Sequence, residues 1–69
     1  MIVLSIDRTK VIRQTLSNFI EAGIITPTEV EHTYSNLAVL STPDLLIALI
    51  ESHNRRNDAL EYKMSLLEN

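Results

Sequence analysis

The feature that most constrains the fold is the long C-terminal stretch, because no glycine and no further proline follow Pro43. Pro43 suits the first turn of a helix, and Asp44 is favourable at the positive end of the helix dipole. Ser41 or Thr42 can cap that helix. The pattern predicts one helix over residues 43–67. At ~1.5 Å of rise per residue it would be roughly 37 Å long.

Two shorter helices are predicted before it. Gly23 can adopt the left-handed conformation that ends a helix. Thr26, Pro27 and Glu29 match a capping box with proline at the first helical position. Apolar residues recur at helical spacing on both sides of this break, which predicts helices over residues 7–22 and 27–39. Neither is long enough to cover the whole C-terminal helix.

Composition supports an all-α fold and a single small domain. One glycine and two prolines are too few for the turns of an all-β chain, and the absence of cysteine excludes disulfides. We therefore expect a three-helix chain in which a helical hairpin packs on a long C-terminal helix. A 69-residue domain has a small core and often needs a partner chain. Residues 2–6 (IVLSI) could form an apolar arm, extend the first helix backwards, or pair as a strand across a dimer axis.

A row of residues along the C-terminal helix has coiled-coil spacing. Successive members are separated alternately by four and three residues, for about three heptads. The row consists of Leu46, Ile50, His53, Asn57, Leu60, Met64 and Leu67. We call it the seam. With Ile50, Asn57 and Met64 at the a positions, the polar Asn57 is the kind of residue that sets register in a two-stranded coil.

Charged residues flank the seam in a compatible pattern. Arg56 and Lys63 fall at g positions, and Glu61 and Glu68 at the following e positions. A parallel homodimer would pair Arg56 with the partner's Glu61, and Lys63 with the partner's Glu68. We therefore predict a homodimer, with residues 54–69 as its projecting dimerisation segment. Three alternatives stay open: an antiparallel dimer, a monomeric bundle with the seam inside, and a seam that binds another protein.

The charge balance disfavours a general nucleic-acid binder. The formal net charge is −3 and the pI is near 5.1, whereas such binders neutralise phosphates with an excess of Lys and Arg. An alternative is a dimeric, transcription-related DNA-binding protein that uses a basic cluster. The candidate basic residues are Arg8, Lys10, Arg13, Arg55 and Arg56. A recognition helix beginning PDLLIALIE would be too apolar and too acidic for a major groove.

No sequence pattern indicates catalysis or a cofactor. Glu29 and His32 have the Glu-x-x-His spacing of di-metal carboxylate sites, but such sites need a second motif and further carboxylates. A metal-binding helical protein that uses Glu29 and His32 is thus a second alternative. A lone His53 in a seam more often packs or hydrogen-bonds than binds a metal. We expect no metal, no cofactor and no enzymatic activity.

The sequence therefore favours a non-enzymatic protein–protein interaction module. We expect a small dimeric intracellular adaptor, or a regulator or inhibitor that binds a larger protein of unknown identity. No apolar run approaches the ~20 residues of a membrane span, so a cytoplasmic location is expected, and a bacterial or phage origin fits the size. Exposed positions on the first two helices are the candidate partner contacts. They are Arg13, Asn18, Glu31, His32 and Asn36.

Overall fold

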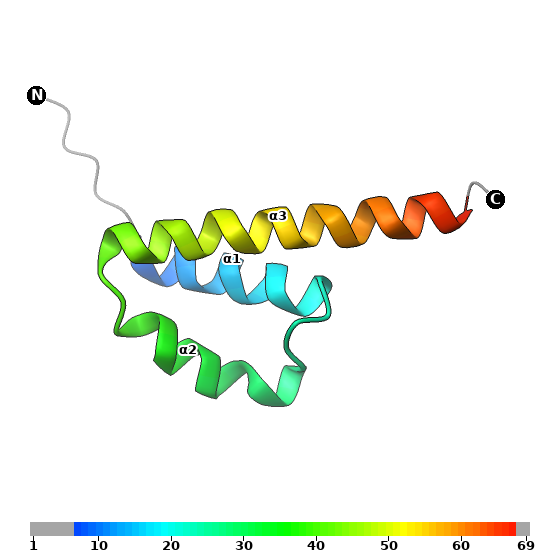
Figure 1. Ribbon diagram of the computed structural model, residues 1–69. Coiled ribbons are helices and arrows are strands. Elements are labelled where there is room, and N and C mark those ends of the chain that lie inside the picture. The colour runs from blue at the N-terminus through cyan, green and yellow to red at the C-terminus, as the bar shows by residue number, and fades with distance from the viewer. Residues whose placement is uncertain (1–6, 68–69) are drawn as a thin grey trace, which may run out of the picture.

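Three α-helices and one short 3-10 turn form the part of the chain that the computed structural model describes, residues 7–67. No strand occurs in this part, so the expected all-α, three-helix class is confirmed. The predicted arm of residues 2–6 and the predicted site residue Glu68 lie outside it. The elements are α1 (Arg8–Glu21), η1 (Pro27–Glu29), α2 (Val30–Ala38) and α3 (Thr42–Leu67) (Figure 1).

Helix α1 is one residue shorter at each end than predicted because both end residues act as caps. The Asp7 side chain accepts a hydrogen bond from the Lys10 amide at 3.2 Å. At the other end, Gly23 has the predicted left-handed conformation, with φ +74°. The Gly23 amide donates to the Ile20 carbonyl at 3.0 Å, and the Ile24 amide donates to the Phe19 carbonyl at 2.9 Å. These two bonds form a Schellman motif.

The predicted second helix is divided into a 3-10 turn and an α-helix. The Glu29 amide donates to the Thr26 carbonyl at 2.9 Å, and the Val30 amide donates to the Pro27 carbonyl. Both bonds span three residues, so the first turn is tighter than an α-helical one. The predicted capping role of Glu29 is present, since its carboxylate accepts from the Thr26 amide at 3.0 Å and from the Thr26 hydroxyl at 2.9 Å.

Helix α3 begins at Thr42, one residue before the predicted start. The Ser41 hydroxyl is the cap, accepting from the Asp44 amide at 3.3 Å, while the Ser41 carbonyl accepts from the Leu45 amide at 2.8 Å. The Thr42 hydroxyl instead accepts from the Arg8 guanidinium at 3.0 Å. The two candidate caps therefore have separate tasks.

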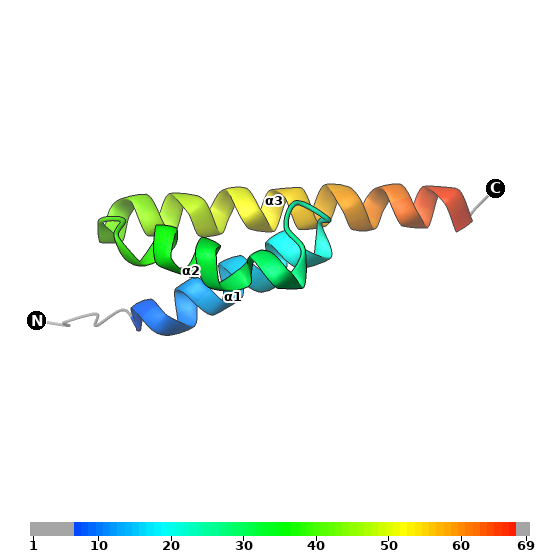
Figure 2. The same cartoon turned by 90° about the horizontal axis from the view of Figure 1, so that it is seen from below.

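Helices α1 and α3 run side by side in the same direction, and α2 returns along α1 (Figures 1 and 2). The Arg8–Thr42 and Asn18–Ser52 hydrogen bonds both join residues 34 positions apart, which shows the common direction. The buried apolar core is small. It consists of Ile12, Leu16, Leu37 and Leu45, with Val11, Ile25, Val30, Leu40 and Ala48 packed partly buried against it.

The C-terminal part of α3 continues past the end of α1 (Figure 1). An ion pair between Arg56 and Glu21 joins α3 to the last residue of α1. Beyond it, the apolar side chains of Leu60, Met64 and Leu67 are exposed. The dimerising role expected for residues 54–69 stays a prediction.

Candidate interaction surface

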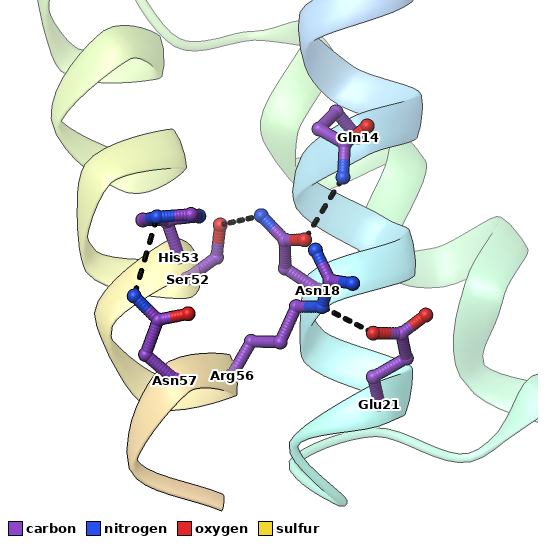
Figure 3. A network of polar contacts seen from close by, with 7 residues as sticks. All are labelled: Gln14, Asn18, Glu21, Ser52, His53, Arg56 and Asn57. Carbon is purple, nitrogen blue, oxygen red and sulfur yellow. Dashed lines mark hydrogen bonds and ion pairs between the residues drawn. The ribbon is translucent and has the colours of Figure 1, made fainter. Parts of the chain in front are cut away.

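A buried polar contact determines which face of α3 packs on α1. Asn18 is 1% exposed and Ser52 is 0% exposed. The Asn18 amide donates to the Ser52 hydroxyl at 3.1 Å (Figure 3). That hydroxyl donates to the Leu49 carbonyl at 2.7 Å. The Gln14 amide donates to the Asn18 side-chain oxygen at 2.9 Å. Each of these buried groups has a partner, which keeps the polar interface stable.

This placement corrects one expectation. Asn18 was grouped with exposed partner contacts, but it is buried between α1 and α3. The signal was in the spacing: Val11, Thr15 and Asn18 lie at i, i+4 and i+7, which is one face of a helix. Thr15 and Asn18 are polar, so this buried face of α1 was not recognised as part of the core from the sequence.

The seam lies on a different face of α3. The face toward α1 carries Leu45 and Ser52, both fully buried. At 3.6 residues per turn, the centre of the seam is rotated from that face by about a quarter turn. Leu46 is partly buried, and the other six seam residues are exposed; among the apolar ones the exposed fraction runs from 41% for Leu60 to 86% for Leu67. The core therefore leaves most of this apolar row uncovered.

The two polar residues of the seam, His53 and Asn57, contact each other within α3. The side-chain nitrogen Nδ2 of Asn57 lies 3.3 Å from Nε2 of His53, one helical turn earlier (Figure 3). Asn57 is the donor, because an amide NH2 group donates hydrogen bonds and does not accept them. Both side chains are exposed. His53 and Asn57 thus meet part of each other's hydrogen-bonding capacity on the surface of one helix.

The residues predicted to flank the seam have different environments. Arg56 is half-buried and forms an ion pair with Glu21 of the same chain (Figure 3). Glu61 and Lys63 are exposed on the projecting part of α3. The intrachain partner of Arg56 is a contact that sequence spacing could not reveal, because Glu21 and Arg56 meet only through the packing of α1 on α3.

A groove runs between α1 and α3 beside the seam. It consists of two adjoining hollows of about 420 and 550 Å³, which share Gln14 and Leu49. The first is also lined by Lys10, Val11 and Arg13, and the second by Asn18, Ile50, His53 and Arg56. Apolar side chains lie between basic ones, and neither hollow is lined by an Asp or a Glu.

The remaining predicted contacts are on α2 and its 3-10 turn. Glu31, His32 and Asn36 are exposed. Hydrogen bonds from the Thr26 amide and hydroxyl lower the pKa of Glu29 below its usual value. Glu29 is thus already engaged as a cap. Within residues 7–67, no three His, Cys, Asp or Glu side chains are grouped as a metal site requires.

Arg8, one of the basic residues in the DNA-binding alternative, is bound within the chain. Its guanidinium donates to the Leu40 carbonyl at 2.7 Å and the Ala38 carbonyl at 3.3 Å, as well as to the Thr42 hydroxyl. The Ala38 carbonyl is at the C-terminal end of α2, where a positive charge complements the helix dipole, and the Leu40 carbonyl lies in the turn that follows. Arg8 therefore connects the α2–α3 turn to α1 and is not directed at a ligand.

In the described part of the chain, no helix combines the length and apolar character that crossing a bilayer demands. Comparison with protein-family models, curated proteins and solved structures gave no match.

Proposed function

We propose that the chain is a non-enzymatic protein–protein interaction module that works as a homodimer joined through the seam of α3. One observation carries this proposal. Helix α3 uses one face for the core, while a second apolar face remains exposed over most of its length. A large exposed apolar patch on a small protein commonly marks an interaction site.

The energetics favour association. Full burial of a Leu, Ile or Met side chain contributes about 1.5–3 kcal/mol. A dimer would cover the apolar seam residues of both copies, and the association cost is about 4–15 kcal/mol. Two copies of Ile50, Leu60, Met64 and Leu67 bring enough exposed apolar surface to offset a cost in the lower part of that range. The core of one chain, with four buried apolar side chains, would be enlarged by a second copy.

In this proposal the dimer presents two α1–α2 hairpins to a larger protein. Exposed polar residues on these helices would contact that partner and block or bridge its surfaces. Asn18 leaves the predicted contact set because it is buried. The set becomes Arg13, Glu31, His32 and Asn36, all exposed.

The experiment is light scattering over a concentration series, with circular dichroism to confirm folding. We expect the mass of a dimer for the unmodified chain. Leu60→Asp would place a charge in the covered seam and yield a helical monomer. Tyr62→Asp, which changes an exposed residue two positions away on another face of α3, is the matched control and should leave the dimer intact. A monomer at every concentration for the unmodified chain would refute the proposal.

A second variant tests whether Asn57 lies inside the dimer interface. Asn57→Ile should raise the thermal stability of the dimer, because it removes a polar group from the seam, and should loosen the choice of orientation or oligomer size. An unchanged melting temperature would show that Asn57 does not lie in a covered seam.

A further inference from the structure

We propose that the two seams pair in antiparallel orientation, so that His53 of each copy lies opposite the partner's Asn57. This inference rests on the proposed dimer and adds its orientation and its central contact. The partner is a second copy of this chain. The argument comes from the order of residues along the seam, the direction of the hydrogen bond between His53 and Asn57, and the ion pair of Arg56.

The seam has a similar order of apolar and polar residues in both directions. Two apolar residues precede the polar pair His53 and Asn57, and two follow it. The apolar residues are Leu46 and Ile50 before the pair, and Leu60 and Met64 after it. In an antiparallel pair centred on residue 55, each residue lies opposite the one at the same distance from the centre. Apolar residues therefore meet apolar residues, and His53 meets the partner's Asn57.

The hydrogen bond within the polar pair makes it complementary to a reversed copy of itself. Because Nδ2 of Asn57 donates, Nε2 of His53 accepts, and the hydrogen of the neutral imidazole is then on Nδ1. This bond leaves one donor on His53, at Nδ1, and one acceptor on Asn57, the amide oxygen. In the antiparallel pair that donor lies opposite the amide oxygen of the partner's Asn57. The two-fold symmetry repeats the contact.

A parallel pair in register places identical groups opposite one another. His53 would lie opposite the partner's His53, and both rings would offer the Nδ1 donor with no acceptor between them. A buried donor without an acceptor weakens association. Asn57 would still be able to pair with the partner's Asn57. The disadvantage of the parallel pair therefore comes from His53.

The ion pair of Arg56 removes part of the support for a parallel pair. A parallel partner would need Arg56 to pair with the partner's Glu61. In the structure Arg56 is half-buried and paired with Glu21 of its own chain (Figure 3). In the antiparallel pair the two copies of Arg56 lie near the centre, each beside its own Glu21. They therefore bring no unpaired like charges to the interface.

The lengths of the helices fit the antiparallel arrangement. Hydrogen bonds between α1 and α3 join residues 34 positions apart, so Glu21, the last residue of α1, is level with residue 55 of α3. A two-fold axis perpendicular to α3 at this level places both copies of α1 on one side of the α3 pair, one after the other. The part of each α3 that continues past α1 (Figure 1) then lies along the first half of the partner's α3.

The mixing of two single variants tests the orientation by the sign of its effect. One chain carries His53→Leu, and the other, with a short tag, carries Asn57→Ile. In an antiparallel pair of unlike chains the two introduced apolar side chains meet, and the remaining His53 meets the remaining Asn57. Antiparallel pairs of like chains place an apolar side chain against a polar one in both central contacts. In a parallel pair only like chains are matched.

Native mass spectrometry of the equilibrated mixture gives the shares of like and unlike dimers. For the antiparallel pair we expect unlike dimers to exceed like dimers, with an exchange constant roughly tenfold or more above its statistical value, because each mismatched contact leaves a buried polar group unpaired. An excess of like dimers would indicate the parallel pair. Tagged and untagged unmodified chains are the control and should mix statistically.

A second mixture tests whether the central residues lie in the interface. It combines the unmodified chain with a tagged chain that carries both His53→Leu and Asn57→Ile. Like dimers should be in excess here in either orientation, because every contact in an unlike dimer places an apolar side chain against a polar one. Statistical mixing in both experiments would overturn the proposed contact.

Introduced cysteines give an independent readout, since the chain has none of its own. In the antiparallel pair residue 46 lies opposite residue 64, so Leu46→Cys and Met64→Cys chains, of which one carries a tag, should form a disulfide with each other. Met64→Cys alone should not crosslink, because its two copies lie roughly 27 Å apart along the axis, beyond the reach of a disulfide. In a parallel pair in register, Met64→Cys alone would crosslink and the unlike chains would not.

The outcomes separate this inference from the proposed function. An excess of unlike dimers with crosslinking between Leu46→Cys and Met64→Cys supports the antiparallel pair. An excess of like dimers, or crosslinking of Met64→Cys with itself, overturns the orientation while the dimer stands. An unmodified chain that is monomeric at every concentration overturns the proposed function and this inference together.

Discussion

The buried contact between Asn18 and Ser52 offers a quantitative test of how α3 is held on α1. Asn18→Ala removes an amide that donates to Ser52 and accepts from Gln14. Gln14 is exposed and can bind water instead. Ser52 keeps its bond to the Leu49 carbonyl and loses only the bond it accepts. Ser52→Ala has the complementary effect, since it leaves a nearly fully buried amide without its acceptor.

Ser52→Ala strands a buried amide and should lose about 1–3 kcal/mol of stability, whereas Asn18→Ala removes a hydrogen bond without stranding a donor and should lose about 0.5–1.5 kcal/mol. The double variant should lose less than the sum of the two, by about 1 kcal/mol, because no partner is left to strand. A domain of this size has a total stability of only a few to about 10 kcal/mol. Each change should therefore produce a clear shift of the unfolding midpoint.

The assay is urea unfolding followed by circular dichroism at 222 nm, at one fixed protein concentration because association contributes to apparent stability. Ser35→Ala is the control, since Ser35 is exposed on α2 and its hydroxyl donates to the Glu31 carbonyl of its own helix. Combined with Ser52→Ala, it should be additive within about 0.3–0.5 kcal/mol. If Asn18→Ala and Ser52→Ala are additive to the same degree, the two side chains are not coupled and the reasoning fails.

Three further predictions concern the ends of the helices. Arg8→Ala should destabilise the fold by about 1–3 kcal/mol in the same urea assay, because Arg8 makes charged hydrogen bonds to the α2–α3 turn; Arg55→Ala, at an exposed position, should change it little. The pKa of Glu29 is lowered in the folded state by the hydrogen bonds from Thr26, so the stability it contributes is present above its usual value of 4.5 and is lost as the pH falls through the lower folded value. The loss of thermal stability between neutral pH and pH 3 should therefore be smaller in Glu29→Gln, and an identical pH profile would contradict the capping role. Gly23→Ala should cost about 1 kcal/mol or more through backbone strain alone, because φ is +74° and nothing lies within 4 Å of an added Cβ; a smaller loss in Gly23→Asn would confirm that cause.

Local signals in the sequence predicted the elements well. Gly23, the Thr26–Glu29 box and the proline-containing start of α3 are short-range devices, and each acts where it was expected. The errors at the helix ends were of one residue, and they arose because a cap and the first helical residue look alike in sequence. The 3-10 turn at Pro27–Glu29 was missed because the same residues fit an α-helical first turn equally well.

The candidate surface was harder to predict. Spacing placed the seam residues on one line of α3, but it could not show whether that line faces the core. The interior position of Asn18, the pairing of Arg56 with Glu21, and the binding of Arg8 to the end of α2 all join residues 30 or more positions apart. Such contacts depend on the packing of whole helices.

The sequence by itself determined the number of helices, their approximate ends and the existence of an apolar row with heptad spacing, because each depends on residues within a few positions of one another. Only the tertiary structure decided which face of α3 is used within the chain. That choice follows from the small side chain of Ser52 and the amide of Asn18, which together let α1 pack on the face next to the seam and leave the seam itself exposed.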